Sequence, residues 1–165
     1  MIHGLRGDEQ AHQEWTAILD RVGTTGGRVH GYGPVFEAML LLHRGQPARA
    51  LEPLAAEPGE VWKWVTWIWL HWYVGLRTEA AVLAGDASAA GRLVSARSMV
   101  AGNPVAEAMV ERAQALFDGD PERVAATAPA FEAAGSRYQA ARSLLLAGGV
   151  HATRGRAALA ELGFA

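Results

Sequence analysis

The sequence predicts an all-α protein, and three observations carry that prediction. Alanine, leucine, glutamate and arginine dominate the chain, and all four residue types favour helices. Apolar residues recur at the three- and four-residue spacing of a helix face, whereas the alternation typical of strands is scarce. Similar junctions separate the helical stretches, with glycines at Gly45, Gly85, Gly119 and Gly149, which lie 40, 34 and 30 residues apart.

A helical unit repeated at this interval is typical of an α-solenoid, because no single unit can bury its own apolar face. The sequence therefore predicts a tetratricopeptide-like α-solenoid of antiparallel helix pairs, with about eight or nine helices in a right-handed superhelical stack. A helical bundle without repeats is the alternative. With 165 residues, the chain is expected to form one helical-repeat domain over 1–165.

The N-terminal third predicts two helices. Asp8 can cap a first helix that runs to about Val22, because a carboxylate at this position satisfies free backbone N–H groups. The glycine-rich segment 23–34 then interrupts the chain. Pro34 suits the first turn of a second helix, which is expected to end near Arg44.

The central third begins with a further helix at Pro47, closed by the sequence EPGE at 57–60. Five of the six tryptophans then fall within residues 62–72. At 100° per residue this stretch predicts a helix to Gly85 with a wide apolar face, and we expect it at the centre of the fold. The apolar side holds Trp62, Val65, Trp69, Trp72, Tyr73 and Leu76, and the polar side holds Lys63, Thr66, His71, Arg77 and Thr78.

Polar residues mark the remaining helix starts. Asp86, Asn103, Asp120 and Ser136 each precede a helical stretch and are predicted N-caps. A short helix over 155–163 is expected at the end of the chain. Within the helix after Ser136, we expect Tyr138 to pack near Phe131 and Arg142 to pair across a helix interface, because no carboxylate lies in its own helix.

The tryptophan stretch has three interpretations. In the first, its aromatic residues form core, so that Trp69 and Trp72 are buried. In the second, Trp64, Trp67 and His71, with Lys63 beside them, line a groove for a peptide or a flat ligand. A β-strand is the third, although the alternation fails. The stretch is shorter than the roughly twenty apolar residues of a membrane helix, so a soluble, cytoplasmic protein is expected.

Composition argues against several function classes. The chain has no cysteine, and its six histidines show no spacing of a helical metal pair. Neither a phosphate-binding loop nor a nucleophile elbow occurs. A net charge of −2 gives no broad basic surface for nucleic acid. We therefore expect a non-enzymatic protein without metal or cofactor and without direct nucleic-acid contact.

Four segments carry a resemblance to a known family. They are EAAVLAGD at 79–86, ERAQALFDGD at 111–120, FEAAGSRYQAARSLLLAGG at 131–149 and RGRAALAELGFA at 154–165. Together with the chain from residue 34 onward, they resemble the helical-repeat region of large bacterial ATP-binding transcriptional regulators of the LuxR family (MalT-like) and of related cyclase–ATPase signalling proteins. The chain contains none of the ATPase, cyclase or DNA-binding modules of those proteins.

The resemblance implies a non-catalytic interaction or sensing domain, excised from a larger bacterial transcriptional regulator. Its partner would be a protein, a peptide, a small inducer or a second copy of the chain. Binding would bias an attached effector module by favouring one of its states. The alternative is a helical protein that binds a small molecule in a tryptophan-lined groove.

Overall fold

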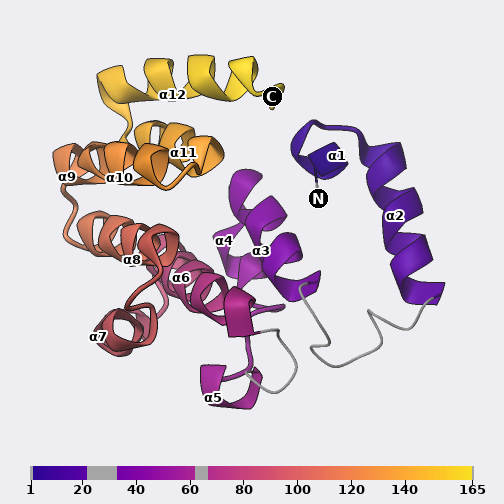
Figure 1. The fold of residues 1–165 in the computed structure, drawn as a ribbon, viewed down its shortest axis with the longest axis horizontal. Coiled ribbons are helices and arrows are strands. Elements are labelled where there is room, and N and C mark those ends of the chain that lie inside the picture. The colour runs from indigo at the N-terminus through magenta and orange to yellow at the C-terminus, as the bar shows by residue number, and fades with distance from the viewer. Residues whose placement is uncertain (1, 22–32, 62–66, 165) are drawn as a thin grey trace.

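A computed structural model describes residues 2–21, 33–61 and 67–164 of the chain (Figure 1). All of the secondary structure in these ranges is helical, so the all-α prediction is confirmed. The helices are α1 (Ile2–Leu5), α2 (Glu9–Arg21), α3 (Gly33–His43), α4 (Pro47–Ala50), α5 (Pro58–Val61), α6 (Trp67–Ala84), α7 (Ala89–Met99), α8 (Pro104–Phe117), α9 (Pro121–Ala126), α10 (Ala128–Ala133), α11 (Arg137–Ala147) and α12 (Gly149–Glu161).

Polar side chains cap the N-termini of several helices at the predicted positions. Three predicted N-caps accept a hydrogen bond from the backbone N–H three residues further on; they are Asp8 at 3.1 Å, Asn103 at 3.1 Å and Asp120 at 3.0 Å. The prediction for Asp86 is wrong, because α7 starts after Ser88 and Asp86 accepts the Ser88 N–H within the preceding turn. Ser136 stands at the N-cap of α11, but its side chain makes no capping hydrogen bond.

Three of the four junction glycines end helices as predicted. Gly45, Gly85 and Gly119 have φ values of 66°, 65° and 69°, a left-handed conformation that glycine adopts without steric cost. In each case the residue after the glycine donates its N–H to a carbonyl five residues back, which closes the helix. Gly149 is the exception, because α11 ends at Ala147 with Gly148 as its C-cap, and Gly149 is the first residue of α12.

Other helix boundaries depart from the prediction. The helical stretch expected after Asp120 is interrupted at Thr127, because Pro129 has no N–H to donate to the preceding turn. The C-terminal helix starts six residues earlier than expected, at Gly149 instead of residue 155. The EPGE sequence does not merely close a helix but supplies most of the helical turn α5.

Helix α6 lies at the centre of the fold, as the sequence predicted (Figure 1). It packs against α3, α4 and α5 on one part of its surface and against α7 and α8 on another. Helices α9, α10 and α11 follow beyond α8, and α12 covers α11 (Figure 1). Among the described residues, no helix combines the length and the apolar character that crossing a membrane requires.

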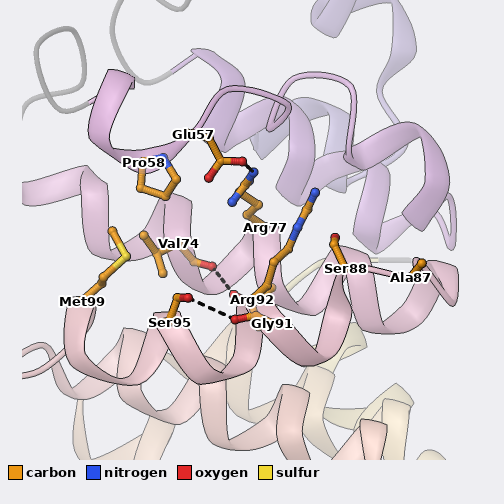
Figure 2. A pocket seen from close by; sticks show the side chains of 12 residues that line it. Glu57, Pro58, Val74, Arg77, Ala87, Ser88, Gly91, Arg92, Ser95 and Met99 are labelled. Atoms are coloured by element: carbon orange, nitrogen blue, oxygen red, sulfur yellow. Dashed lines mark hydrogen bonds and ion pairs between the residues drawn. The ribbon is translucent and has the colours of Figure 1, made fainter.

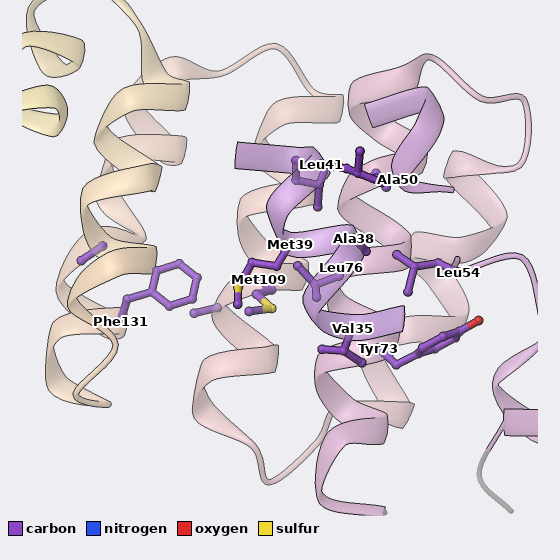
Figure 3. Close-up of a cluster of buried hydrophobic side chains, with 14 of the residues drawn as sticks. Val35, Ala38, Met39, Leu41, Ala50, Leu54, Tyr73, Leu76, Met109 and Phe131 are labelled. Carbon is purple, nitrogen blue, oxygen red and sulfur yellow. The ribbon is translucent and has the colours of Figure 1, made fainter. Parts of the chain in front are cut away.

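The main hydrophobic core lies where α3, α4 and α6 meet α8, α10 and α11 (Figure 3). Tyr73 and Leu76 of α6 are fully buried in this core, together with Met109 and Phe131. Trp69 and Trp72 are only half-buried at its edge, so the prediction of their burial is met in part. Their rings meet edge to face, with centroids 5.9 Å apart.

The expected polar face of α6 is the clearest error of the sequence prediction. Arg77 and Thr78 are buried, and so is every residue from 73 to 81. A helix with neighbours on all sides has no solvated face, so its polar side chains must find partners inside the protein. Thr78 Oγ1 donates to the Val74 carbonyl at 2.8 Å, within the same helix.

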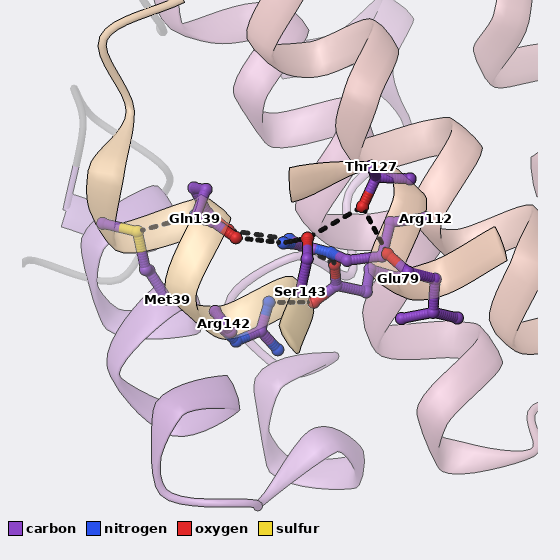
Figure 4. Close-up of polar contacts among 8 residues, drawn as sticks. Met39, Glu79, Arg112, Thr127, Gln139, Arg142 and Ser143 are labelled. Carbon is purple, nitrogen blue, oxygen red and sulfur yellow. Dashed lines mark hydrogen bonds and ion pairs between the residues drawn. The ribbon is translucent and has the colours of Figure 1, made fainter. Parts of the chain in front are cut away.

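A buried ion cluster joins α6, α8 and α11 (Figure 4). Arg112 donates from Nε to Oε2 of Glu79 at 2.7 Å, and Arg142 forms an ion pair with the other carboxylate oxygen of Glu79. Arg112 also donates to the Gln139 side chain at 2.7 Å and to Ser143 Oγ at 3.0 Å. The prediction that Arg142 pairs across a helix interface is therefore confirmed.

Burial and pairing set the charge states in this cluster. Burial by itself raises the pKa of Glu79, but Arg112 and Arg142 outweigh it, so the pKa lies below its usual value. Burial lowers the pKa of Arg112 to about 10, and its contact with Glu79 opposes that shift. Glu79 and Arg112 are therefore charged at neutral pH, and with the guanidinium of Arg142 the cluster holds two positive charges and one negative charge.

Tyr138 links α11 to two distant parts of the chain. Its hydroxyl lies 3.2 Å from His43 Nδ1 at the end of α3. The Phe164 ring near the C-terminus packs edge-on against Tyr138, with centroids 5.5 Å apart. The side chain thus packs from α11 against the core cluster that contains Phe131, and within the described residues its ring contacts are with His43 and Phe164.

Candidate functional site

A pocket of about 460 Å³ opens between α5, α6 and α7 (Figure 2). This volume lies within the range of about 300–1,000 Å³ that small-molecule sites occupy. Its walls come from the α5 turn, from the middle of α6 and from the first three turns of α7. The pocket therefore exists because the α6–α7 junction folds α7 back along α6.

Arg77 is the charged residue that α6 contributes to the pocket, next to Val74 and Thr78. The residue is 7% exposed, and its Nε donates to the Leu54 carbonyl at 3.1 Å. Its Nη2 forms an ion pair with Glu57, whose side chain is 69% exposed at the rim. One side of the guanidinium is thus held by a buried carbonyl, and the other by a carboxylate in contact with solvent.

Arg92 reaches the same pocket from α7 and lies beside Arg77 (Figure 2). Its Nη1 atom is buried and has no hydrogen-bond partner in the part of the chain that the structure describes. Burial lowers the pKa of Arg92, and the charge of Arg77 lowers it further, while Asp86 and Glu57 act in the opposite direction. A buried donor without a partner is costly, so the hydrogen-bonding capacity of the Arg92 guanidinium is only partly satisfied within the described residues.

The hydroxyl groups on the walls already have partners. Thr78 donates to the Val74 carbonyl, Ser95 donates to the Gly91 carbonyl at 3.1 Å, and Ser88 donates to Asp86. Thr78 and Ser95 donate to backbone carbonyls, which are not bases, and the Ser88 contact lowers the pKa of Asp86, so this carboxylate is a weak base for activating a nucleophile. The first turn of α7 adds the positive end of its helix dipole to the two guanidiniums.

An apolar wall completes the pocket. Pro58, Val74, Ala96 and Met99 line it, and Figure 2 shows Pro58, Val74 and Met99 together, away from Ser88 and Ala87. Two cationic groups in the middle and an apolar surface to one side describe a site for an amphiphilic anion. Aliphatic walls supply affinity through burial of apolar surface, and the charges orient the ligand.

Most of the residues predicted for a tryptophan-lined groove lie outside the described part of the chain. Lys63 and Trp64 lie outside the described residues. Trp67 is the first residue of α6, but its side chain also lies outside the described part. His71 is half-buried on α6. The groove of the second interpretation therefore stays a prediction.

The pocket residues carry little recognisable signal in the sequence. Arg77 was assigned to a solvated helix face, and Arg92 is one arginine among many in an alanine-rich stretch. They lie fifteen positions apart on different helices, so only the packing of α7 against α6 brings them together. Among the described residues, no three histidine, aspartate or glutamate side chains gather closely enough to hold a metal ion.

Comparisons with known proteins were made at three levels. No family model, no curated protein and no solved structure matches the chain. The function is therefore inferred from the geometry of the pocket and from the sequence.

Proposed function

We propose that the chain is a non-catalytic binding domain that takes a small anionic molecule into the pocket between α5, α6 and α7. The observation that carries this proposal is the pair of guanidinium side chains, Arg77 from α6 and Arg92 from α7, that line one pocket. An incoming anion would form ion pairs with these two groups. Hydrogen bonds between charged groups are the strong ones in proteins, and guanidinium groups match carboxylate and phosphate oxygens well.

The hydrogen bonds of the residues that line the pocket support binding rather than catalysis. The pocket hydroxyls of Thr78, Ser88 and Ser95 are hydrogen-bonded to acceptors of their own surroundings. The one carboxylate in the pocket lining, Glu57, is paired with Arg77. A general base would need to be free to take a proton from the substrate, so these groups suit recognition better than a reaction.

The finer description of the fold belongs to the same proposal. Helices that end in left-handed glycines at Gly45, Gly85, Gly119 and Gly135 support a tetratricopeptide-like solenoid of antiparallel pairs. On the resemblance to LuxR-family regulators, the domain would be the sensing or interaction segment of a bacterial transcriptional regulator. Ligand binding would then favour one arrangement of an attached effector module.

Helix α6 offers a route from the pocket to the rest of the domain. It carries Arg77 into the pocket and, two residues later, Glu79 into the buried ion cluster with α8 and α11. A ligand that fixes Arg77 would therefore restrain the helix on which the central packing depends. A ligand that binds only the folded state stabilises it by an amount that grows with the logarithm of the ligand concentration above Kd.

The test is a comparison of four single-chain amphiphiles of equal length by titration calorimetry and thermal unfolding. Octanoate and octyl phosphate carry an anion, 1-octanol is neutral and octylamine is cationic. We expect the anions to bind and raise the unfolding midpoint, and Arg92→Gln to abolish that difference. Equal binding of octanol and octanoate would show that the arginines do not recognise charge, and would refute the proposal.

A further inference from the structure

We infer that Phe164 is a latch that fastens the end of α12 to the N-terminal helices, by closing on a slot between His43 of α3 and Tyr138 of α11. The two walls of the slot are 95 positions apart in the sequence. The residues that line the pocket come from α5, α6, α7 and the turns beside them, so the latch is a separate feature and does not rest on the proposed function.

A glycine turn after α12 directs Phe164 toward the slot. Helix α12 ends at Glu161, and Gly163 has a φ of 74°, in the left-handed region that glycine adopts without steric cost. The Gly163 N–H donates to the Ala160 carbonyl at 2.9 Å. The Phe164 N–H donates to the Leu159 carbonyl, also at 2.9 Å. These two bonds form a Schellman motif, which ends a helix and reverses the chain, so the backbone sets the direction in which the ring leaves α12.

Three aromatic rings make up the latch. The Phe164 ring meets the Tyr138 ring edge to face, with centroids 5.5 Å apart and an angle of 86° between the planes. It also meets His43 edge to face, with centroids 6.5 Å apart. The Tyr138 hydroxyl lies 3.2 Å from His43 Nδ1, which holds the two walls of the slot together. Edge-to-face contacts are favourable, because the positive edge of one ring meets the negative face of another.

The first helix reaches the same place. Leu5 of α1 is buried, and a Cβ on Gly4 would lie 2.9 Å from Leu40 Cδ2, so α1 lies closely against α3. Arg6 then approaches the turn after α12, because a Cβ on Gly163 would lie 3.6 Å from Arg6 Nε (Figure 1). The latch therefore has α1 and α3 on one side and α11 and α12 on the other.

The contacts of Phe164 are weak enough to open without loss of the fold. Phe164 is half-buried, whereas Phe131 in the main core is fully buried. Each ring contact favours the closed state by about two- to tenfold, so the two contacts together favour it by about four- to a hundredfold. The open state is then populated at about 1–20%. A partner that binds the open state about a hundredfold more tightly would bring even a 1% population to about half.

Phe164→Ala tests the latch, and Phe131→Ala is the matched control for the loss of a core phenylalanine. We expect Phe164→Ala to leave the urea midpoint close to that of the wild type, whereas Phe131→Ala should lower it strongly. Phe164→Ala should also speed hydrogen exchange of the Arg6 and Arg44 amides by about fourfold or more. Both amides are hydrogen-bonded to backbone carbonyls at the ends of α1 and α3, far from Phe164 in the sequence.

Ionisation of Tyr138 gives a second readout. Burial raises the pKa of Tyr138 above 10.0. Phe164→Ala uncovers one face of the ring, so the pKa should fall towards 10.0, which a titration of the phenol carbon by NMR measures. Val150→Ala is the control on the same helix, because Val150 is 80% exposed. It should change neither the pKa of Tyr138 nor the exchange of the two amides.

Three results would overturn the inference. If Phe164→Ala lowers the urea midpoint as much as Phe131→Ala, or does not fold, Phe164 is a core residue and not a latch. If the Arg6 and Arg44 amides exchange at the wild-type rate, Phe164 does not couple the two ends of the fold. If the pKa of Tyr138 does not move, the ring does not cover the slot in solution.

A measurement on the unaltered protein needs no substitution. Nuclear Overhauser contacts from the Phe164 ring to both His43 and Tyr138 are expected, because the closed state predominates. Their absence would refute the closed state directly.

Discussion

Removal of the charge on Glu79 is the most informative single change in the core. Glu79 is fully buried and accepts from Arg112 at 2.7 Å, while Arg142 pairs with its other oxygen. In Glu79→Gln the shape is kept, but two buried guanidiniums lose their counter-charge. The loss of one partner from a buried ion pair costs about 3–5 kcal/mol, because the remaining charge stays buried without compensation.

We expect the cost of Glu79→Gln to lie in the upper part of that range, because the guanidinium of Arg142 loses its counter-charge as well as that of Arg112. Arg142 Nη2 is buried and already lacks a hydrogen-bond partner among the described residues. Arg112 retains its bonds to Gln139 and Ser143, and its guanidinium lies 4.7 Å from the centre of the Phe131 ring. These contacts hold Arg112 in place, so the repulsion between the two arginines cannot be relieved by a simple rotation.

Urea unfolding followed by far-ultraviolet circular dichroism measures the effect. We expect a lower midpoint with an unchanged slope, which reports a loss of stability without a change in the surface exposed. Glu111→Gln is the control, because it also removes a carboxylate from an arginine, at 2.7 Å from Arg123, but at the surface. Exposed pairs contribute about 0–1 kcal/mol. If both variants unfold at the same midpoint, the buried cluster does not stabilise the fold as argued.

Three further predictions follow from packing and ionisation. Gly155→Ala should destabilise the protein by about 1–3 kcal/mol, because the added Cβ would lie 2.5 Å from the Leu145 backbone nitrogen. Gly91→Ala is the control; it has open space around it and should stabilise the protein by about 0.5–1 kcal/mol. Equal unfolding midpoints for the two variants would contradict the close approach of α11 and α12. The pKa of Glu79 is lowered from 4.5 in the folded state, so its contribution to the free energy of unfolding is present above pH 4.5 and is lost as the pH falls below 4.5. The stability difference between the wild type and Glu79→Gln should therefore shrink on acidification, and a constant difference in urea midpoints would show otherwise. Burial raises the pKa of Tyr73 from 10.0 to about 12, so its phenol should ionise late in an ultraviolet titration and the folded state should lose stability across that interval; a Tyr73→Phe variant with the same alkaline loss would rule this out.

Local features of the fold could be predicted from the sequence because their causes are local. Asp8, Asn103 and Asp120 cap helices through hydrogen bonds that span three residues, and each was identified from its own neighbourhood. The glycines at 45, 85 and 119 end helices for the same kind of reason. The interruption at Thr127 was missed, although the proline two residues later is the physical signal for it.

The polar residues of α6 could not be assigned because their partners are distant in the chain. Arg77 bonds to Leu54 and Glu57, and Glu79 pairs with arginines of α8 and α11. In an isolated helix, these polar side chains would face water. In the folded protein they are buried, because the neighbouring helices surround α6 and supply their partners. The same argument applies to the pocket, whose two arginines come from helices that the sequence does not place side by side.

A structure of the wild-type protein with octanoate, by crystallography or by intermolecular NMR contacts, tests the central claim most directly. We expect the carboxylate within hydrogen-bond distance of Arg92 and Arg77, with the alkyl chain along Pro58, Val74 and Met99. Octanoate bound against the tryptophan stretch 62–72, or an empty pocket at saturating octanoate, would contradict the assignment of the site.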